Sequence, residues 1–261
     1  MSVCIARQIN DGDILAQGIA TPLVMAGLLL GKLTRAPHVW FASAIGQGVC
    51  RDWAPVGLCR VEDLWIGKAL ATLGFAMIAC ELLPRFHLKE FFRPAQVDAA
   101  GNFNNVFIGQ SYDRPRLRLP GCGGIADVTT FSTTVHLYVP RHSRAVFVER
   151  LDFVSGLGHS PARRAGQGPH YCVTDLGEFD FAHGRMRLIR TFPGQSPESI
   201  QAKTGFELDV APNVSPTPPP SAEEVRLLRQ VIDPLGVRRL ELSGGSARKA
   251  LLQEILVREK A

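Results

Sequence analysis

Short apolar runs separated by polar turns dominate the first part of the chain. A polar turn at residues 10–13 precedes an apolar run at residues 14–17, which is short enough for a buried strand. The pair Thr21-Pro22 then predicts a helix over residues 22–33, because threonine can cap a helix and proline fits its first position. Residues 39–42 form the next apolar run. This strand–helix–strand order predicts an α/β fold with a parallel sheet covered by helices.

The middle of the chain is expected to add one helical segment and three strands. Residues 61–83 are apolar and largely helical in character, although two glycines lie inside them. Residues 91–97 are typical of a strand that ends in a turn over residues 98–102. Further strands are expected at residues 136–139 and 146–154.

The last third of the chain has a different pattern. Residues 171–181 and 185–192 alternate around a short turn, which predicts an antiparallel hairpin. Residues 221–224 (Ser-Ala-Glu-Glu) form a capping box that begins another helix. We expect a single α/β domain over residues 1–235 and a C-terminal tail over residues 236–261 that can form a helix.

Composition narrows the class of protein without identifying it. The 261 residues are 46% hydrophobic and 20% charged, with a net charge of +5. This mild charge fits a partner that bears phosphates, although a solvated surface explains it better, and no basic run with interleaved aromatic residues supports nucleic-acid binding. Residues 14–31 carry no charge and approach the length of a membrane span, but Gln17 and Pro22 interrupt them, so a strand and a helix explain them better. We expect a cytoplasmic protein that binds neither nucleic acid nor membrane.

The six cysteines do not predict a metal site or a disulfide framework. None of them has a CxxC spacing, and the seven histidines form no ligand cluster with them. Reduced thiols are therefore expected, as is usual in the cytosol.

The loop that is richest in glycine follows an extended basic segment and has the sequence Pro120-Gly121-Cys122-Gly123-Gly124. Successive N–H groups of such a loop can bind an oxyanion or a phosphate. A tight turn packed against a neighbour explains the same residues equally well. The spacing is not that of a dinucleotide-binding fingerprint, and no acidic residue follows at the required distance.

Amide and carboxylate side chains gather around one turn in the middle of the chain. They are Gln96, Asp98, Asn102, Asn104 and Asn105. Neutral amides are suited to orienting a thioester or a carboxylate. Taken alone, however, Asp98 and Asn102 are better explained as residues that build the turn.

Ser43 is the one reactive side chain at the end of the strand over residues 39–42. It has no GxSxG motif around it, and no histidine or aspartate can be assigned as its base. A packing or hydrogen-bonding role is therefore favoured over a role as nucleophile.

Several stretches in a fixed order give the chain a resemblance to a known family. They are ARQINDGDILAQGIATPL, PAQVDAAGNFNNVFIG, RPRLRLPGCGG, FVERLDFVSGLG, CVTDLGEFDF, TGFELDV and EEVRLLRQVIDP. Together they resemble the β subunit of class I CoA-transferases, of the glutaconate CoA-transferase type, from about Arg7 to Pro234. The resemblance implies a mostly parallel sheet with helices on both faces and an α subunit of similar fold, in a heterodimer or heterotetramer with its active site between the subunits.

The resemblance also implies a ligand and its contacts. The ligand is an acyl-CoA, with coenzyme A as part of the substrate and no covalently bound cofactor or metal. The implied contacts to the thioester or to CoA are Gly121, Gly123 and Gly124. The implied substrate contacts are Ser43, Gln96, Asn102 and Asn104.

One position departs from the family pattern. Transferases of this family carry a nucleophilic glutamate at the strand end, in a Glu-Ser-Gly or Glu-Asn-Gly motif, and the corresponding residues here are Ala42-Ser43-Ala44. Covalent catalysis needs the carboxylate itself. The resemblance includes relatives without this glutamate: steroid-ring-cleaving CoA-ester hydrolases, whose catalytic carboxylate belongs to the α subunit, and a CoA-ester decarboxylase.

Three functions therefore stay open. The first is a subunit of an enzyme that cleaves a C–C bond of an acyl-CoA, with the base supplied by the partner subunit. The second is an acyl-CoA:carboxylate CoA-transferase that uses Asp52 or Glu62 as its nucleophile. The third is a non-catalytic subunit that only shapes the interface.

Overall fold

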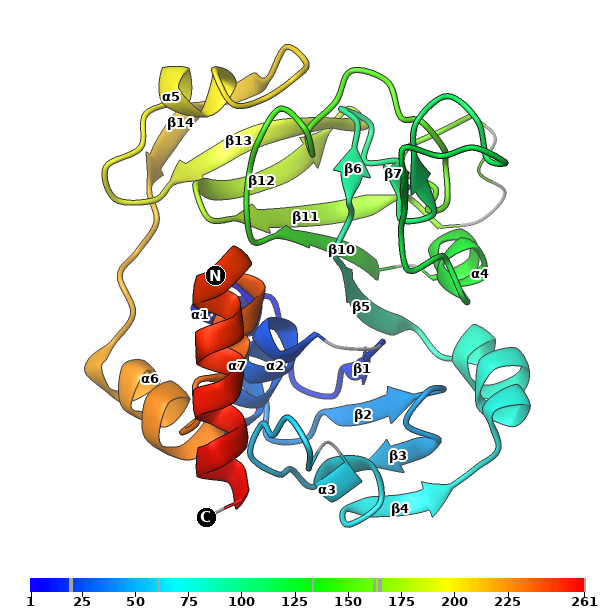
Figure 1. Ribbon diagram of the computed structural model, residues 1–261, viewed down its shortest axis with the longest axis vertical. Helices are drawn as coiled ribbons and strands as arrows, with labels where there is room; N and C mark the ends of the chain where they lie inside the picture. The colour runs from blue at the N-terminus through cyan, green and yellow to red at the C-terminus, as the bar shows by residue number, and fades with distance from the viewer. Residues whose placement is uncertain (19–20, 61, 133, 162, 164–165, 261) are drawn as a thin grey trace. The chain divides into compact units, whose positions relative to one another are not determined.

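A computed structural model describes residues 1–18, 21–60, 62–132, 134–161, 163 and 166–260, and for residue 62 the backbone alone. The chain divides into two compact units, residues 1–88 with 219–261 and residues 89–218. The single domain expected over residues 1–235 stays a prediction, and the C-terminal residues belong to the first unit. The predicted α/β class is confirmed, since both units combine sheet and helices (Figure 1).

The first unit contains a four-stranded run in the order β1-β2-β3-β4. Strands β1 and β2 are parallel, with Ala16 beside Ala42, whereas β3 and β4 continue antiparallel. Its strands are β1 (Ile14–Ala16), β2 (Trp40–Ser43), β3 (Gly48–Cys50) and β4 (Ala69–Thr72). Its α-helices are α1 (Ser2–Arg7), α2 (Pro22–Thr34), α3 (Glu62–Trp65), α6 (Ala222–Arg226) and α7 (Gly245–Lys260), and its shorter or wider helical turns are η1 (Met77–Leu82), η2 (Leu83–Arg85), η3 (Leu227–Ile232) and η4 (Val237–Glu241).

Helices α1 and α2 pack closely because small residues face the contact. A Cβ atom on Gly27 would lie 2.6 Å from the Ile5 side chain, so only glycine permits this approach. Ile5 and Leu28 are completely buried there. The helix predicted over residues 22–33 is confirmed as α2, with proline in its first turn.

The C-terminal tail is part of the first unit. Glu259 lies in the last turn of α7, and its carboxylate accepts hydrogen bonds from the backbone N–H groups of Leu58 (2.7 Å) and Cys59 (2.8 Å). Arg258 donates to the carbonyl of Pro234 at 2.9 Å. The bonds of Glu259 hold the helix against the loop that follows β3, and the bond of Arg258 holds it against the segment that follows η3.

The second unit contains a run of strands in the order β14-β13-β12-β11-β10-β5. Strand β10 is parallel to both β5 and β11, and β13 is parallel to β14, whereas β11-β12 and β12-β13 are antiparallel. The strands are β5 (Leu88–Phe92), β10 (Thr134–Val139), β11 (Pro169–Thr174), β12 (Gly177–Ala182), β13 (Arg185–Thr191) and β14 (Asp209–Pro216). The smaller elements are β6 (Gln96–Val97), β7 (Phe103–Asn104), β8 (Phe107–Ile108), β9 (Leu117–Arg118), α4 (Ile125–Phe131) and α5 (Pro197–Gln201).

The hydrophobic core of the second unit is rich in aromatic side chains. Phe103, Phe147 and Phe179 are completely buried in it. The predicted hairpin is confirmed as β12 and β13, although a turn divides residues 171–181 into β11 and β12.

Three expected elements differ from the structure. The helical segment expected over residues 61–83 is helical at residues 62–65 and 75–83, but residues 69–72 between them form β4, which pairs with β3. The strand expected over residues 91–97 is interrupted at Pro94, which has no N–H to donate to a ladder. No strand forms over residues 146–154, because the N–H of Phe147 closes a turn onto Ser143, 2.8 Å away, and its ring fills the core.

Candidate active site

The carboxyl end of β2 carries Ala42 and Ser43, and both side chains are buried. The Ser43 hydroxyl donates to the carbonyl of Gln17 at 2.9 Å and accepts from the N–H of Gly46 at 2.9 Å. No described histidine or carboxylate makes a hydrogen bond to it. Ser43 thus has the hydrogen-bonding role that its sequence context favours, and it joins β1 to the turn after β2.

Gln17, at the carboxyl end of β1, is a candidate that the sequence did not reveal. Its side-chain oxygen Oε1 is buried and has no hydrogen-bond partner among the described residues. Its Nε2 donates to the Thr21 hydroxyl at 3.3 Å. A buried amide oxygen without a partner is costly, so the side chain is able to accept a hydrogen bond from a ligand. Its place directly after a buried strand is the one sequence signal that could have singled it out.

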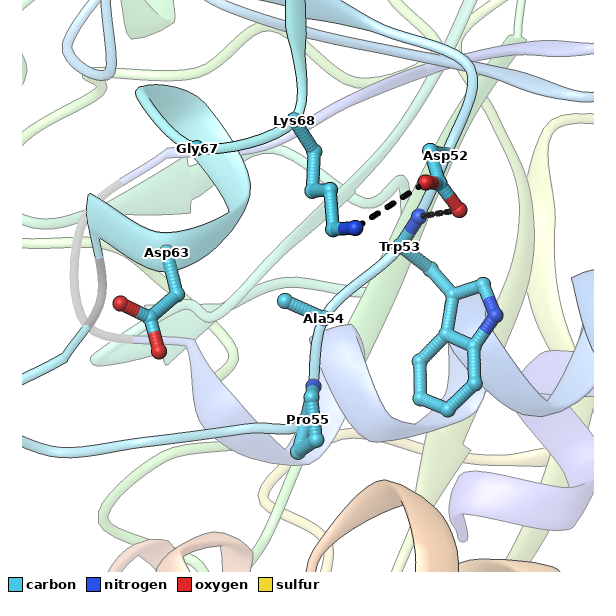
Figure 2. A pocket seen from close by; sticks show the side chains of 7 residues that line it. All are labelled: Asp52, Trp53, Ala54, Pro55, Asp63, Gly67 and Lys68. Atoms are coloured by element: carbon cyan, nitrogen blue, oxygen red, sulfur yellow. Dashed lines mark hydrogen bonds and ion pairs between the residues drawn. The ribbon is translucent and has the colours of Figure 1, made fainter.

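Asp52 lies at the opposite end of the same strands. Cys50 on β3 pairs with Phe41 on β2, so Asp52 lies beyond the amino end of β2, roughly 10 Å or more from Ser43 along the strand. It lines a pocket of ≈ 480 Å³, where its carboxylate is paired with Lys68 at 3.2 Å (Figure 2). The N–H of Trp53 and the Lys68 ammonium hold the pKa of Asp52 below its ordinary value. Asp52 therefore does not take the place of the glutamate that the family pattern expects at position 42. The Glu62 side chain lies outside the described part of the chain.

In the second unit, Gln96 and Asn104 are brought together. Asn104 is completely buried, and its Nδ2 donates to Gln96 Oε1 (2.8 Å) and to the carbonyl of Phe107 (2.7 Å). Its Oδ1 accepts from the N–H of Val106 at 2.9 Å. Gln96 Nε2 in turn donates to Asp152 at 3.2 Å. These bonds fix the segment between β7 and β8.

Asn102 belongs to a separate network. Its Nδ2 donates to Asp98 at 2.9 Å, and its Oδ1 accepts from the N–H of Gly158 at 2.8 Å. The other Asp98 oxygen accepts from the N–H groups of Ala100 and Asn102, each at 2.9 Å. Burial raises the pKa of Asp98, and these hydrogen bonds oppose the rise. Asp98 and Asn102 therefore build the turn between β6 and β7.

The glycine loop forms an open turn before α4. A Cβ atom added to Gly121, Gly123 or Gly124 would meet no atom within 4 Å. Gly121 and Gly124 adopt positive φ angles of 107° and 77°, which other residues rarely adopt, whereas Gly123 does not. The tight turn that the sequence analysis gave as an alternative explanation is present, but no neighbouring segment packs against its glycines.

Backbone donors of this loop are free to bind a ligand. The N–H of Gly121 donates to the carbonyl of Asn105 at 2.9 Å, which joins the loop to the segment that Asn104 organises. Within the described residues, the N–H groups of Cys122, Gly123 and Gly124 donate to no acceptor. Three successive donors of this kind can bind the oxygen of a polarised or anionic carbonyl group.

The structure places the predicted site residues in both units. Ser43 belongs to the first unit, and the amides and the glycine loop belong to the second. In the described parts of the chain, no group of three His, Cys, Asp or Glu side chains could hold a metal ion. Their cysteines are all free thiols, and their helices include none long and apolar enough to cross a membrane.

Comparison with known proteins identifies the family. The chain is 32% identical over 255 residues to the β subunit of glutaconate CoA-transferase from Acidaminococcus fermentans, an alignment that covers 89% of this chain and 91% of the relative. The chain is a β subunit of the class I CoA-transferase family. No family model matches it.

Two further relatives show that this family includes other reactions. The chain is 31% identical over 240 residues to the cholesterol ring-cleaving hydrolase IpdB subunit of Rhodococcus jostii, covering 89% of this chain and 90% of the relative. It also superimposes on a chain of the decarboxylase AibA/AibB with a TM-score of 0.80 and 29% identity, covering 93% of this chain and 97% of the other. The predicted resemblance to transferase, hydrolase and decarboxylase members is confirmed.

Proposed function

We propose that this β subunit works with an α subunit to cleave a C–C bond of an acyl-CoA thioester rather than to exchange its CoA. The observation that carries the proposal is the carboxyl end of β2. By the sequence resemblance, Ala42 corresponds to the glutamate of the transferases, and the hydroxyl of Ser43 is committed to Gln17 and Gly46. Without a carboxylate there, the thioester has no nucleophile to form an enzyme-bound CoA thioester.

The glycine loop supports the same chemistry. When a C–C bond conjugated with the thioester carbonyl breaks, by hydrolysis or by loss of carbon dioxide, the electron pair is delocalised onto the thioester oxygen as an enolate. The free N–H groups of Cys122, Gly123 and Gly124 would stabilise that oxygen. A proton then restores the thioester, which stays esterified to CoA. The base is expected from the α partner, as the ring-cleaving and decarboxylase relatives are two-subunit enzymes by name.

Gln17 and the bonded pair Gln96–Asn104 have different parts in this proposal. The unpaired oxygen of Gln17 would accept a hydrogen bond from a ligand at the carboxyl ends of β1 and β2. Gln96 and Asn104 would position the segment that carries the glycine loop, through Asn105 and Gly121.

CoA transfer is the second candidate, favoured by the similarity to the glutaconate CoA-transferase β chain. It would need a nucleophile other than Asp52, whose carboxylate lies at the amino end of β2 and is paired with Lys68. A non-catalytic role for this chain is the third candidate. It predicts that obstruction of the glycine loop leaves the activity of the complex unchanged.

The deciding experiment uses the chain co-purified with its α partner. Candidate acyl-CoA esters are supplied in oxygen-18 water, with and without acetate, and the products are read by mass spectrometry. A labelled carboxylate on a product still esterified to CoA supports hydrolytic C–C cleavage, and unlabelled loss of carbon dioxide supports decarboxylation. Acetyl-CoA that forms only with acetate would show transfer and refute the proposal.

A further inference from the structure

Three unpaired arginines line one open groove of the second unit. The groove has a volume of ≈ 1000 Å³, and Arg114, Arg116 and Arg150 contribute to its walls. All three are exposed, and none makes a hydrogen bond or ion pair with a described residue. Arg118 nearby differs, because it donates to the carbonyl of Tyr112 at 2.7 Å and covers the Tyr112 ring.

The residues that line the groove carry a net positive charge. Asp152 is the one acid among its lining residues, and its Oδ2 accepts hydrogen bonds from the N–H of Gly109 (2.8 Å) and from Gln96 Nε2 (3.2 Å). These donors offset part of the Asp152 charge. Three guanidinium groups that line one space and make no ion pair with a described acid repel one another and match a ligand with several phosphate oxygens.

The arginines come from two separately anchored segments. Arg114 and Arg116 lie in the loop between β8 and β9, whose strands pair Ile108 with Leu117. Arg150 follows a segment held by the bond from the N–H of Val148 to the carbonyl of Val97, at 2.9 Å. The groove is therefore built from fixed backbone segments, and its long side chains can adjust to a ligand.

One wall of the groove continues into the glycine loop. Leu119 lines the groove, and its N–H donates to the carbonyl of Val106 at 3.0 Å. Gly123 is four residues further along the chain, at most about 14 Å away. Apolar side chains beside the arginines, among them Ile108 and Val146, offer a surface for a flat ring. A ligand would thus meet cationic and apolar groups at one end and free N–H donors at the other.

We infer that this groove binds the phosphorylated nucleotide end of the acyl-CoA, with Arg114, Arg116 and Arg150 on its phosphate oxygens. The inference rests on the proposed function, because it assigns the far end of the same substrate. The nucleotide end of CoA carries a pyrophosphate and a 3′-phosphate, which suits three arginines, and its adenine suits the apolar wall.

The test is direct binding to the complex with its α partner, measured by isothermal titration calorimetry. The probes are CoA, adenosine 3′,5′-bisphosphate, inorganic phosphate and pantetheine, which lacks phosphates. The double variant Arg114→Gln/Arg116→Gln and the variant Arg150→Gln are compared with the control Arg141→Gln. Arg141 is also exposed and unpaired among the described residues of this unit, but it lies outside the groove.

The expected result is a Kd for CoA and for the bisphosphate that rises roughly tenfold or more in the groove variants, because charge-assisted bonds are lost. The Kd of the groove variants for pantetheine should not change, and neither should the Kd of the control Arg141→Gln for CoA. A Kd for CoA within twofold of the unchanged protein would overturn the inference. So would inorganic phosphate bound as tightly as the bisphosphate, which would indicate a general anion site.

The two proposals can fail separately. Arginine-dependent CoA binding in a complex that forms acetyl-CoA with acetate would refute C–C cleavage and support the groove. Turnover of an acyl-CoA by C–C cleavage, with a KM that the groove variants leave unchanged, would refute the groove alone.

Discussion

The substitution Gly123→Val tests whether the glycine loop takes part in the reaction or is only a structural turn. A Cβ atom at this position meets nothing within 4 Å, and the backbone of Gly123 is outside the left-handed region. The folded chain can therefore accept a side chain here, and we expect the free energy of unfolding to change by no more than about 0.5 kcal/mol. The added methyl groups would occupy the space beside the free N–H groups of Cys122, Gly123 and Gly124.

The size of the effect on activity follows from the donors that are blocked. Loss of one oxyanion donor in an enzyme typically costs about 10²- to 10³-fold in kcat, or roughly 3–4 kcal/mol of transition-state stabilisation. Three successive donors are at risk here. We therefore expect kcat/KM for the acyl-CoA to fall at least a hundredfold in the αβ complex.

The assay compares Gly123→Val with Gly74→Val, since Gly74 is equally open and also has no positive φ angle. Thermal unfolding and co-purification with the α partner check that both variants fold and assemble. Activity of Gly123→Val within threefold of the unchanged complex, with normal folding, would refute the oxyanion role of the loop and support a non-catalytic role for this chain.

Three further predictions address other parts of the chain. Ser43→Ala should keep kcat within a fewfold and lower the free energy of unfolding by about 1–2 kcal/mol, because it removes two structural hydrogen bonds; a thousandfold loss of kcat would instead identify a nucleophile. Burial raises the pKa of Glu90 from 4.5 to about 7, so the folded state holds a proton that the unfolded chain releases, and stability should fall by roughly 3 kcal/mol as the pH rises between these values. Urea unfolding at pH 5 and pH 8 checks this, and Glu90→Gln should flatten the pH dependence, whereas equal slopes in both proteins would contradict it. Asn104→Ala should cost about 1–3 kcal/mol, because the N–H of Val106 and Gln96 Oε1 lose a buried partner; chemical unfolding measures it, and an unchanged midpoint would show that water replaces the amide.

Local signals along the chain predicted the elements whose cause is local. Pro22 marked the start of α2 through its fixed φ angle, although the Thr21 side chain makes no capping hydrogen bond. The capping box at residues 221–224 marked α6 through hydrogen bonds within a few residues. The ordered motifs predicted the family, which the similarity to the glutaconate CoA-transferase β subunit confirms. That Ala42 replaces the glutamate of the transferases stays a prediction of the sequence resemblance.

Tertiary structure decided the rest, because burial and pairing depend on residues distant in sequence. Apolar residues 69–72 became β4 through their pairing with β3, although their composition indicated a helix. The amino-end position of Asp52 follows from the antiparallel register of β2 and β3, which no local pattern encodes. Likewise, the orphan oxygen of Gln17 and the groove that joins Arg150 to Arg114 exist only once separate segments have packed together.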